Sequence, residues 1–193
     1  MATPRVLDVL AERGLKATFF VVGRQLEHYR TLAARAAQDG HWIGNHTMTH
    51  PRPLGLREAG AADEIEDAQA LLGELSRPEK LFRPSGAGGD LEPGLLNHTA
   101  VGTLIGGGYT CVLWNAVPRD WEDQDGWVDR ALEQIEERDW TLLVLHDVQD
   151  ASAARLEEFL DRAGDVTFRQ DFPPDCVPIR DRKLVGPIRG LLA

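Results

Sequence analysis

The polar side chains that could do chemistry stand directly after apolar runs of the sequence. Four such runs are followed by a histidine pair, an arginine, an aspartate beside a tryptophan, and a further histidine, namely His46 and His50, Arg83, Asp120 and Trp121, and His146. In folds with parallel strands and covering helices, the chemistry lies at the carboxyl ends of the strands. If the apolar runs are neighbouring parallel strands, these side chains converge at one end of the sheet.

The spacing of His46 and His50 is that of two ligands for one metal ion. Imidazoles four residues apart, on a helical turn or in a tight loop, can be aimed at the same cation. Pro51 disfavours a helix at His50. Taken alone, such a pair is more often two ordinary surface or core histidines, and its position after a strand is what favours a metal site.

The other three polar positions each have an ordinary alternative. Arg83 can orient a carboxylate or can be a solvated loop arginine. Asp120 follows Pro118-Arg119 and fits a turn residue equally well. His146 ends an apolar run and would also fit a histidine at the edge of the core. Their arrangement after successive strands is the reason to read them as one site.

The elements that must position these residues alternate along most of the chain. Apolar runs predict strands at 17–22, 42–44, 81–82, 109–114, 141–145 and 166–168, and helices are expected at 3–13, 29–39, 56–75, about 93–105, 127–138 and 151–163. This alternation predicts a parallel sheet covered by helices. A full eight-unit barrel needs roughly 250 residues, so a short or distorted barrel fits better, with a doubly wound open sheet as the alternative.

Composition limits the classes of function. The 193 residues are 42% hydrophobic, enough for a core without disulfides or metals. The net charge of −10 argues against nucleic acid or an anionic membrane surface as a partner. No apolar run is long enough for a transmembrane helix. The two cysteines, Cys111 and Cys176, are expected to be buried thiols or a single disulfide.

The N-terminal residues carry no visible targeting signal. Residues 1–5 lack a basic region followed by an apolar run, so a cytoplasmic location is expected for the chain as written. If the N-terminus is truncated, a signal peptide would be lost with it, and an extracellular or cell-envelope location is expected instead.

Taken together, these segments resemble the polysaccharide deacetylases, the NodB-homology enzymes of carbohydrate esterase family 4. The stretch KATFFVVG at 16–23 is similar to the family's second-strand signature, and NHTMTH at 45–50 contains its H-[ST]-x-x-H motif. The stretches FRPSG at 82–86, WNAVPRDW at 114–121 and LVLH at 143–146 resemble its Arg-Pro, Asp-Trp and L-x-L-H motifs. The resemblance runs over about residues 3–150, in family order.

The resemblance implies both a fold and a reaction. The fold is a distorted (β/α) barrel of about seven units, placed at residues 1–170, with 171–193 as an irregular C-terminal extension packed on it. The reaction is hydrolysis of the N-acetyl group of an amino sugar in a polysaccharide. The implied cofactor is a divalent metal, usually zinc.

The resemblance also implies a role for each site residue. His46 and His50 would ligate the metal, and His146 would be the general acid that protonates the leaving amine. Asp120 would orient and polarise His146. Arg83 would hold the catalytic base, and Trp121 would form one wall of the pocket for the acetyl methyl group.

The family's first strand, which ends in T-F-D-D-G, has no counterpart in this chain. One of those aspartates is the general base and the other is the third metal ligand, whereas Asp8, the only early aspartate here, lies inside a predicted helix. Either the written start is an internal methionine of a longer protein, or the chain is a degenerate member that cannot use the family mechanism. Val117 and Ser85-Gly86 also depart from the motifs and would reshape the substrate cleft.

Three functions therefore remain open. The first is a metal-dependent deacetylase acting on an N-acetylated carbohydrate, and the second is a hydrolase of a cyclic amide or imide. The third is a non-catalytic carbohydrate-binding protein on a degenerate deacetylase fold. The presence of both Asp120 and His146 favours chemistry, because binding alone does not need an acid with an orienting carboxylate. The sequence does not specify the polymer or the oligomeric state.

Overall fold

The computed structural model describes residues 2–86, 88–147 and 152–193, and the chain divides into two compact units. The sheet unit comprises Thr18–Leu113 and Pro174–Ala193, and the helical unit comprises Met1–Ala17 and Trp114–Pro173. Each unit is therefore built from two stretches of chain that are distant in sequence. None of the described helices combines the length and the apolar character that a transmembrane span requires.

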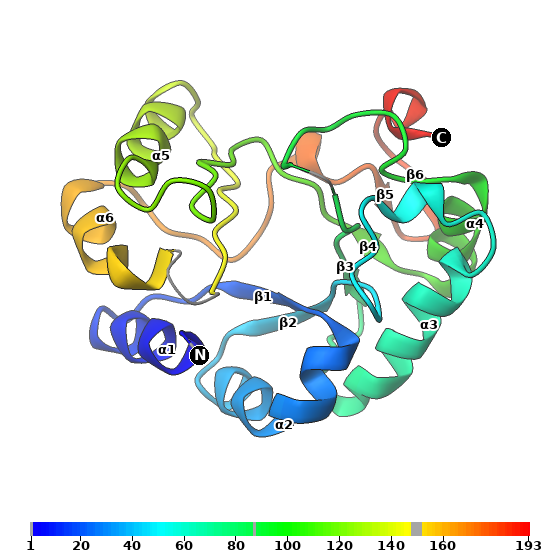
Figure 1. Cartoon of the computed structure of the whole chain (residues 1–193), viewed down its shortest axis with the longest axis horizontal. Coiled ribbons are helices and arrows are strands. Elements are labelled where there is room, and N and C mark those ends of the chain that lie inside the picture. The colour runs from blue at the N-terminus through cyan, green and yellow to red at the C-terminus, as the bar shows by residue number, and fades with distance from the viewer. Residues whose placement is uncertain (1, 87, 148–151) are drawn as a thin grey trace. The chain divides into compact units, whose positions relative to one another are not determined.

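The six strands of the described chain all belong to the sheet unit and lie side by side in sequence order (Figure 1). The parallel strands are β1 (Thr18–Val21), β2 (Trp42–Asn45), β3 (Leu81–Phe82) and β4 (Thr110–Cys111). An order without reversal is that of a singly wound sheet, so the doubly wound alternative does not fit. The described strands form an open sheet, and the barrel implied by the resemblance remains a prediction.

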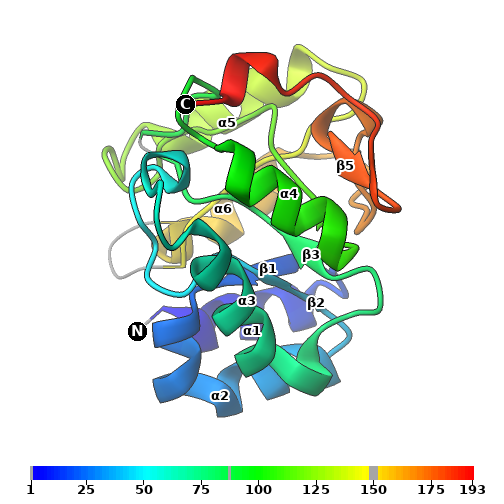
Figure 2. The same ribbon diagram turned by 90° about the vertical axis from the view of Figure 1, so that its right-hand side faces the viewer.

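Three helices follow the parallel strands in the sheet unit. They are α2 (Gly23–Gln38), α3 (Ala61–Leu72) and α4 (His98–Gly107), and Figure 2 shows α3 beside α4. The apolar residues of α3 recur every three or four positions, and four of them are buried, namely Ala61, Ile65, Ala68 and Leu72. This confirms the amphipathic helix and places its apolar face in the core.

The helix boundaries differ from the sequence prediction where local backbone conformation decides them. Leu54–Leu56 form a 3₁₀ turn, and Gly60 takes a left-handed conformation with φ of 93°, so α3 starts at Ala61 rather than at residue 56. The Asn97 side chain accepts the Ala100 amide at 2.8 Å and caps α4, which therefore starts at His98 rather than near residue 93.

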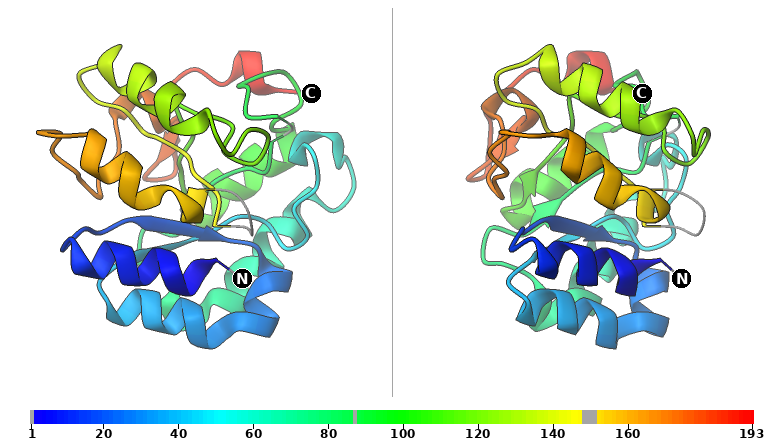
Figure 3. Two further views of the ribbon diagram at one scale, coloured as in Figure 1. Left: turned by 60° about the vertical axis from the view of Figure 1, so that its left-hand side comes forward. Right: turned by 90° about the vertical axis from the view of Figure 1, so that its left-hand side faces the viewer.

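The helical unit contains α1 (Thr3–Glu12), α5 (Trp127–Glu136) and α6 (Leu156–Arg162) (Figure 3). The rings of Trp127 and Phe159 lie 5.7 Å apart and join α5 to α6, while α1 packs against α6. The helix expected at 151–163 is a 3₁₀ turn, Ser152–Ala154, followed by α6; residue 151 lies outside the described residues.

Two predicted strands are wrong. Residues 141–145 make only an isolated bridge between Ala116 and Leu143, because the side chain of Asn115 takes the Leu142 amide at 2.7 Å in place of a neighbouring strand. Residues 166–168 are irregular, because Val166 and Phe168 are 39% and 40% exposed and do not enter the core.

The tail after Asp171 is more regular than the sequence predicts. β5 (Ile179–Arg180) pairs antiparallel with β4, and β6 (Lys183–Leu184) completes a hairpin with β5. Ile179 is fully buried, which explains why this proline-rich segment still joins the sheet. Cys111 and Cys176 are both buried thiols, so the disulfide alternative does not apply.

The close approach of Gly55 to the main chain gives a test of the sheet unit. A Cβ at this position would meet the carbonyl oxygens of Gly94 and Leu96, which belong to backbone that cannot move aside cheaply. Gly55→Ala is expected to destabilise the protein by about 1–3 kcal/mol in equilibrium urea unfolding. Gly102→Ala is the matched control, because a Cβ at this exposed position of α4 meets nothing within 4 Å and should stabilise the protein by about 0.5–1 kcal/mol. Equal stability of Gly55→Ala and the parent would contradict the packing.

Candidate active site

The histidine pair lies in a tight loop at residues 46–50, directly after β2, which we call the histidine loop. Thr47 and His50 have left-handed backbones, with φ of 69° and 58°, so the segment cannot be helical. The rings of His46 and His50 nevertheless lie edge to face, with centroids 4.8 Å apart. Of the two geometries that the spacing allowed, the structure adopts the loop.

The backbone of the histidine loop is bonded to the junction between β1 and α2. The His46 amide donates to the Val21 carbonyl at 3.0 Å. In the first turn of α2, the amides of Gly23 and Arg24 donate to the carbonyls of Thr47 and Met48, at 2.9 and 3.0 Å. The loop thus satisfies amide donors of a helix that would otherwise lack intrahelical partners.

The tautomer of His46 follows from one contact. Its Nδ1 lies 2.8 Å from the Arg83 carbonyl, which can only accept a hydrogen bond, so in the neutral ring Nδ1 carries the proton and Nε2 the lone pair. A backbone carbonyl behind a ligating imidazole is a common way of orienting the ring toward a metal.

The donor set of the histidine loop matches zinc in type but is incomplete. Two neutral imidazoles are ordinary zinc ligands, whereas catalytic zinc sites usually have three protein ligands. Among the described residues, no cluster of three or more His, Cys, Asp or Glu side chains suited to a metal is found. His46 and His50 can therefore supply two of the ligands of such a site.

Arg83 is a buried cation. Its Nε and Nη2 donate to the carbonyls of Val112 and Leu113 at 3.2 and 3.0 Å, and its guanidinium stacks over the Phe20 ring at 4.2 Å. Desolvation lowers the pKa of Arg83 to about 10. Burial also raises the pKa of the nearby Cys111 thiol to about 12. At neutral pH the guanidinium is charged and the thiol is protonated, so this part of the sheet unit carries a fixed positive charge.

The second group of predicted residues lies in the helical unit. Asp120 is fully buried, and its Oδ1 lies 2.9 Å from Nδ1 of His146. Its Oδ2 accepts the His146 amide at 2.8 Å. The Trp121 ring meets the His146 ring edge to face, with centroids 4.6 Å apart. A carboxylate at Nδ1 leaves Nε2 of the neutral ring as the atom that exchanges a proton with a reactant.

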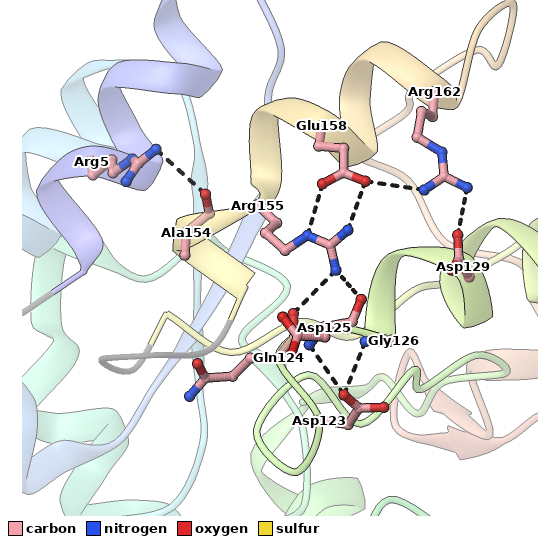
Figure 4. Close-up of polar contacts among 10 residues, drawn as sticks. All are labelled: Arg5, Asp123, Gln124, Asp125, Gly126, Asp129, Ala154, Arg155, Glu158 and Arg162. Atoms are coloured by element: carbon pink, nitrogen blue, oxygen red, sulfur yellow. Dashed lines mark hydrogen bonds and ion pairs between the residues drawn. The ribbon is translucent and has the colours of Figure 1, made fainter.

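Hydrogen bonds brace the loop at residues 123–126, which precedes α5 (Figure 4). Asp123 accepts the amides of Asp125 and Gly126 at the start of α5, at 3.1 and 2.9 Å. Arg155 binds Glu158 through two nitrogens, at 2.7 and 2.8 Å, and also donates to the carbonyls of Gln124 and Asp125. These contacts tie the loop to both α5 and α6.

Each unit therefore gathers three of the six predicted site residues. The sheet unit holds His46, His50 and Arg83, and the helical unit holds Asp120, Trp121 and His146. Within each unit the three are linked by direct contacts, whereas the convergence of all six on one site remains a prediction. Their individual chemical roles remain predictions.

The sequence prediction missed two residues that hold these groups in place. Ser152 donates its amide to Asp120 Oδ2 at 3.2 Å and its hydroxyl to the His146 carbonyl at 2.9 Å, and nothing in the sequence marks it. Glu64 binds Thr49 in the histidine loop. The available signal for Glu64 was an acidic residue on the apolar face of α3, where ionised side chains are rare unless paired.

Comparison with known proteins identifies the family. The polysaccharide deacetylase family model matches residues 1–93. A chitooligosaccharide deacetylase from Sinorhizobium fredii is 34% identical over 147 residues, which cover 75% of this chain and 65% of that protein. The chain belongs to the polysaccharide deacetylase family. This family is generally metal-dependent.

Solved structures of family members share the mixed α/β fold. The peptidoglycan deacetylase PdaC from Bacillus subtilis superimposes with a TM-score of 0.72 and 28% identity, over 88% of this chain and 79% of that one. A family pseudoenzyme from Bacillus anthracis superimposes with a TM-score of 0.69 and 20% identity, over 88% and 58%, which shows a common fold alone. This member of the deacetylase family therefore shares its fold with a peptidoglycan deacetylase and with a family pseudoenzyme.

The buried pair of Asp120 and His146 gives a test of the helical unit. An asparagine at position 120 can offer its amide group to Nδ1, which then must carry the lone pair, so Asp120→Asn is expected to move the His146 proton to Nε2. The ¹⁵N chemical shifts of the ring, measured where the imidazole is neutral, report the tautomer. Asp129→Asn, an exposed acid on α5, is the control and should leave His146 unchanged. The asparagine oxygen is expected to take the place of Oδ2, which accepts the amides of His146 and Ser152, so an unchanged tautomer would contradict this geometry.

Proposed function

We propose that this member of the polysaccharide deacetylase family is a metal-dependent hydrolase that removes the acetyl group from an N-acetylated amino sugar of a polysaccharide. The observation that carries the proposal is the buried Asp120 carboxylate bonded to Nδ1 of His146. A histidine whose orientation and tautomer are set by a buried acid is the arrangement that general acid–base catalysis requires.

His146 acts as the general acid in this proposal. Its Nε2 gives a proton to the amine that leaves when the amide bond breaks, and the Asp120 carboxylate stabilises the cationic ring. Ser152 holds the carbonyl of His146 and one oxygen of Asp120, which limits rotation of the pair. Trp121, edge to face with the His146 ring, supplies an apolar wall suited to the acetyl methyl group.

His46 and His50 are the residues that would hold the divalent cation, with zinc as the proposed ion. When bound there, the cation would polarise the amide carbonyl and favour ionisation of a neighbouring water. The Arg83 carbonyl orients His46 through Nδ1, and the buried Arg83 guanidinium supplies positive charge suited to holding the carboxylate of a catalytic base.

A non-catalytic carbohydrate-binding protein is the second candidate. It is favoured by the two-histidine donor set, since the described residues include no cluster of three metal-type ligands. The matched region spans 65% of the Sinorhizobium relative, whose printed activity is chitooligosaccharide deacetylation. The alternative predicts sugar binding without acetate release at any zinc concentration.

Acetate release from N-acetylglucosamine oligomers and from peptidoglycan fragments, with zinc titrated in, tests the proposal. His146→Gln is expected to lower kcat by about 10²–10⁴-fold, because the general acid is lost while the fold is kept. His98→Gln, an exposed histidine on α4, is the matched control and should retain full activity.

Sugar binding and hydrolysis of cyclic ureides, measured beside acetate release, separate the alternatives. Saturable sugar binding with no acetate released would favour the binding protein. Hydrolysis of a cyclic ureide, with no action on acetylated sugars, would favour the cyclic amide hydrolase. Equal activity of His146→Gln and the parent would show that His146 is not the acid.

A further inference from the structure

A buried acid on α3 contacts the histidine loop without being one of the predicted ligands. The Glu64 side chain is only 6% exposed. Its Oε2 accepts the Thr49 amide at 2.7 Å and its Oε1 accepts the Thr49 hydroxyl at 2.5 Å. Arg57 lies 3.4 Å from Oε1. Both carboxylate oxygens are thus used, and two of the three contacts are to the residue that immediately precedes His50.

The histidine loop needs such a restraint because its conformation is costly. Non-glycine residues with left-handed backbones are strained and persist only where the surroundings hold them. The loop has two, Thr47 and His50. The first is restrained by Asn45, whose Oδ1 accepts the Thr47 amide at 2.9 Å. At the second, the Thr47 hydroxyl accepts the His50 amide at 3.1 Å. From outside the loop, Glu64 accepts the amide of Thr49, the residue before His50.

We infer that Glu64 is a positioning residue that fixes the orientation of His50 through Thr49. This inference rests on the proposed function for the role of His50 toward the cation, whereas the restraint on the loop itself does not. Glu64 belongs to a helix whose apolar face is buried, so its carboxylate connects Thr49 of the loop directly to the core of the sheet unit. Neither Glu64 nor Thr49 contacts the reacting atoms in this assignment.

The chemistry of the contact predicts which substitutions are tolerated. Glu64→Ala removes both acceptors and should release the loop. Glu64→Gln can keep both contacts, because its amide oxygen accepts the Thr49 amide and its NH₂ group donates to the Thr49 hydroxyl. Glu66→Ala is the matched control, since Glu66 is an exposed acid on the same helix. Thr49→Val removes the hydroxyl contact and keeps the amide contact.

Two measurements on the full chain test the inference. Amide hydrogen exchange in the metal-free protein should be faster at Thr49 and His50 in Glu64→Ala, and as slow as in the parent in Glu64→Gln and Glu66→Ala. Calorimetric titration with zinc, and with cobalt as a spectroscopic probe, should show affinity weakened about tenfold in Glu64→Ala. Adding Thr49→Val to Glu64→Ala should cause little further loss, because the two residues share one contact.

Each outcome decides the matter. Unchanged exchange at Thr49 and His50 in Glu64→Ala would overturn the inference, and so would faster exchange with zinc affinity equal to that of Glu66→Ala. If the parent chain itself binds no divalent cation, the metal-dependent function fails, and the exchange data alone then judge the restraint. Circular dichroism of each variant and the expected rescue by Glu64→Gln separate loss of the restraint from loss of the fold.

Discussion

A single buried amide, the side chain of Asn45, joins three parts of the sheet unit. It is fully buried at the end of β2, where each of its polar atoms must find a partner. Its Nδ2 donates to the Ile65 carbonyl of α3 at 2.8 Å, its Oδ1 accepts the Thr47 amide, and its own carbonyl accepts the Arg83 amide at 2.9 Å. The strand, the helix and the histidine loop therefore all bond to this one residue, which fixes the start of the loop that carries His46 and His50.

The two histidine-bearing groups are built on the same principle in different units. In each, a ring nitrogen faces an oxygen that the fold holds fixed: the Arg83 carbonyl for His46, and the Asp120 carboxylate for His146. The difference between a neutral carbonyl and a carboxylate matters chemically. A carbonyl orients a neutral imidazole, which suits a ligand, whereas a carboxylate also stabilises the protonated ring, which suits an acid. The proposed roles follow from this difference, with His46 as a metal ligand and His146 as the general acid.

Much of the architecture could be predicted from the sequence because it depends on periodic apolar residues. The helices near residues 3–13, 56–75 and 127–138 and the first strands appear where the pattern placed them. The boundaries of α3 and α4 could not be predicted, because they depend on a 3₁₀ turn and on the cap supplied by Asn97. The strand expected at 141–145 failed because a side chain, that of Asn115, competes for the backbone.

The site shows the same limit. Motif order alone singles out the two histidines of the loop, Arg83, Asp120, Trp121 and His146, and their chemical roles remain predictions. Glu64 and Ser152 could not be found in this way, because their importance lies in contacts between segments that are distant along the chain, and neither stands at a strand end. Residues that hold a site in place carry no local signature when the geometry they enforce belongs to another segment.

The interleaving of the two units has a consequence for the evolution of such chains. The hydrogen bond between His46 and the Arg83 carbonyl and the one between Asp120 and His146 each lie within one unit, so substitutions can remove one of them while the other is kept. In the proposed function, cation binding and proton transfer would then be separately heritable properties of one fold. A family with this construction is expected to give rise repeatedly to paralogues that keep the fold and have lost catalytic activity.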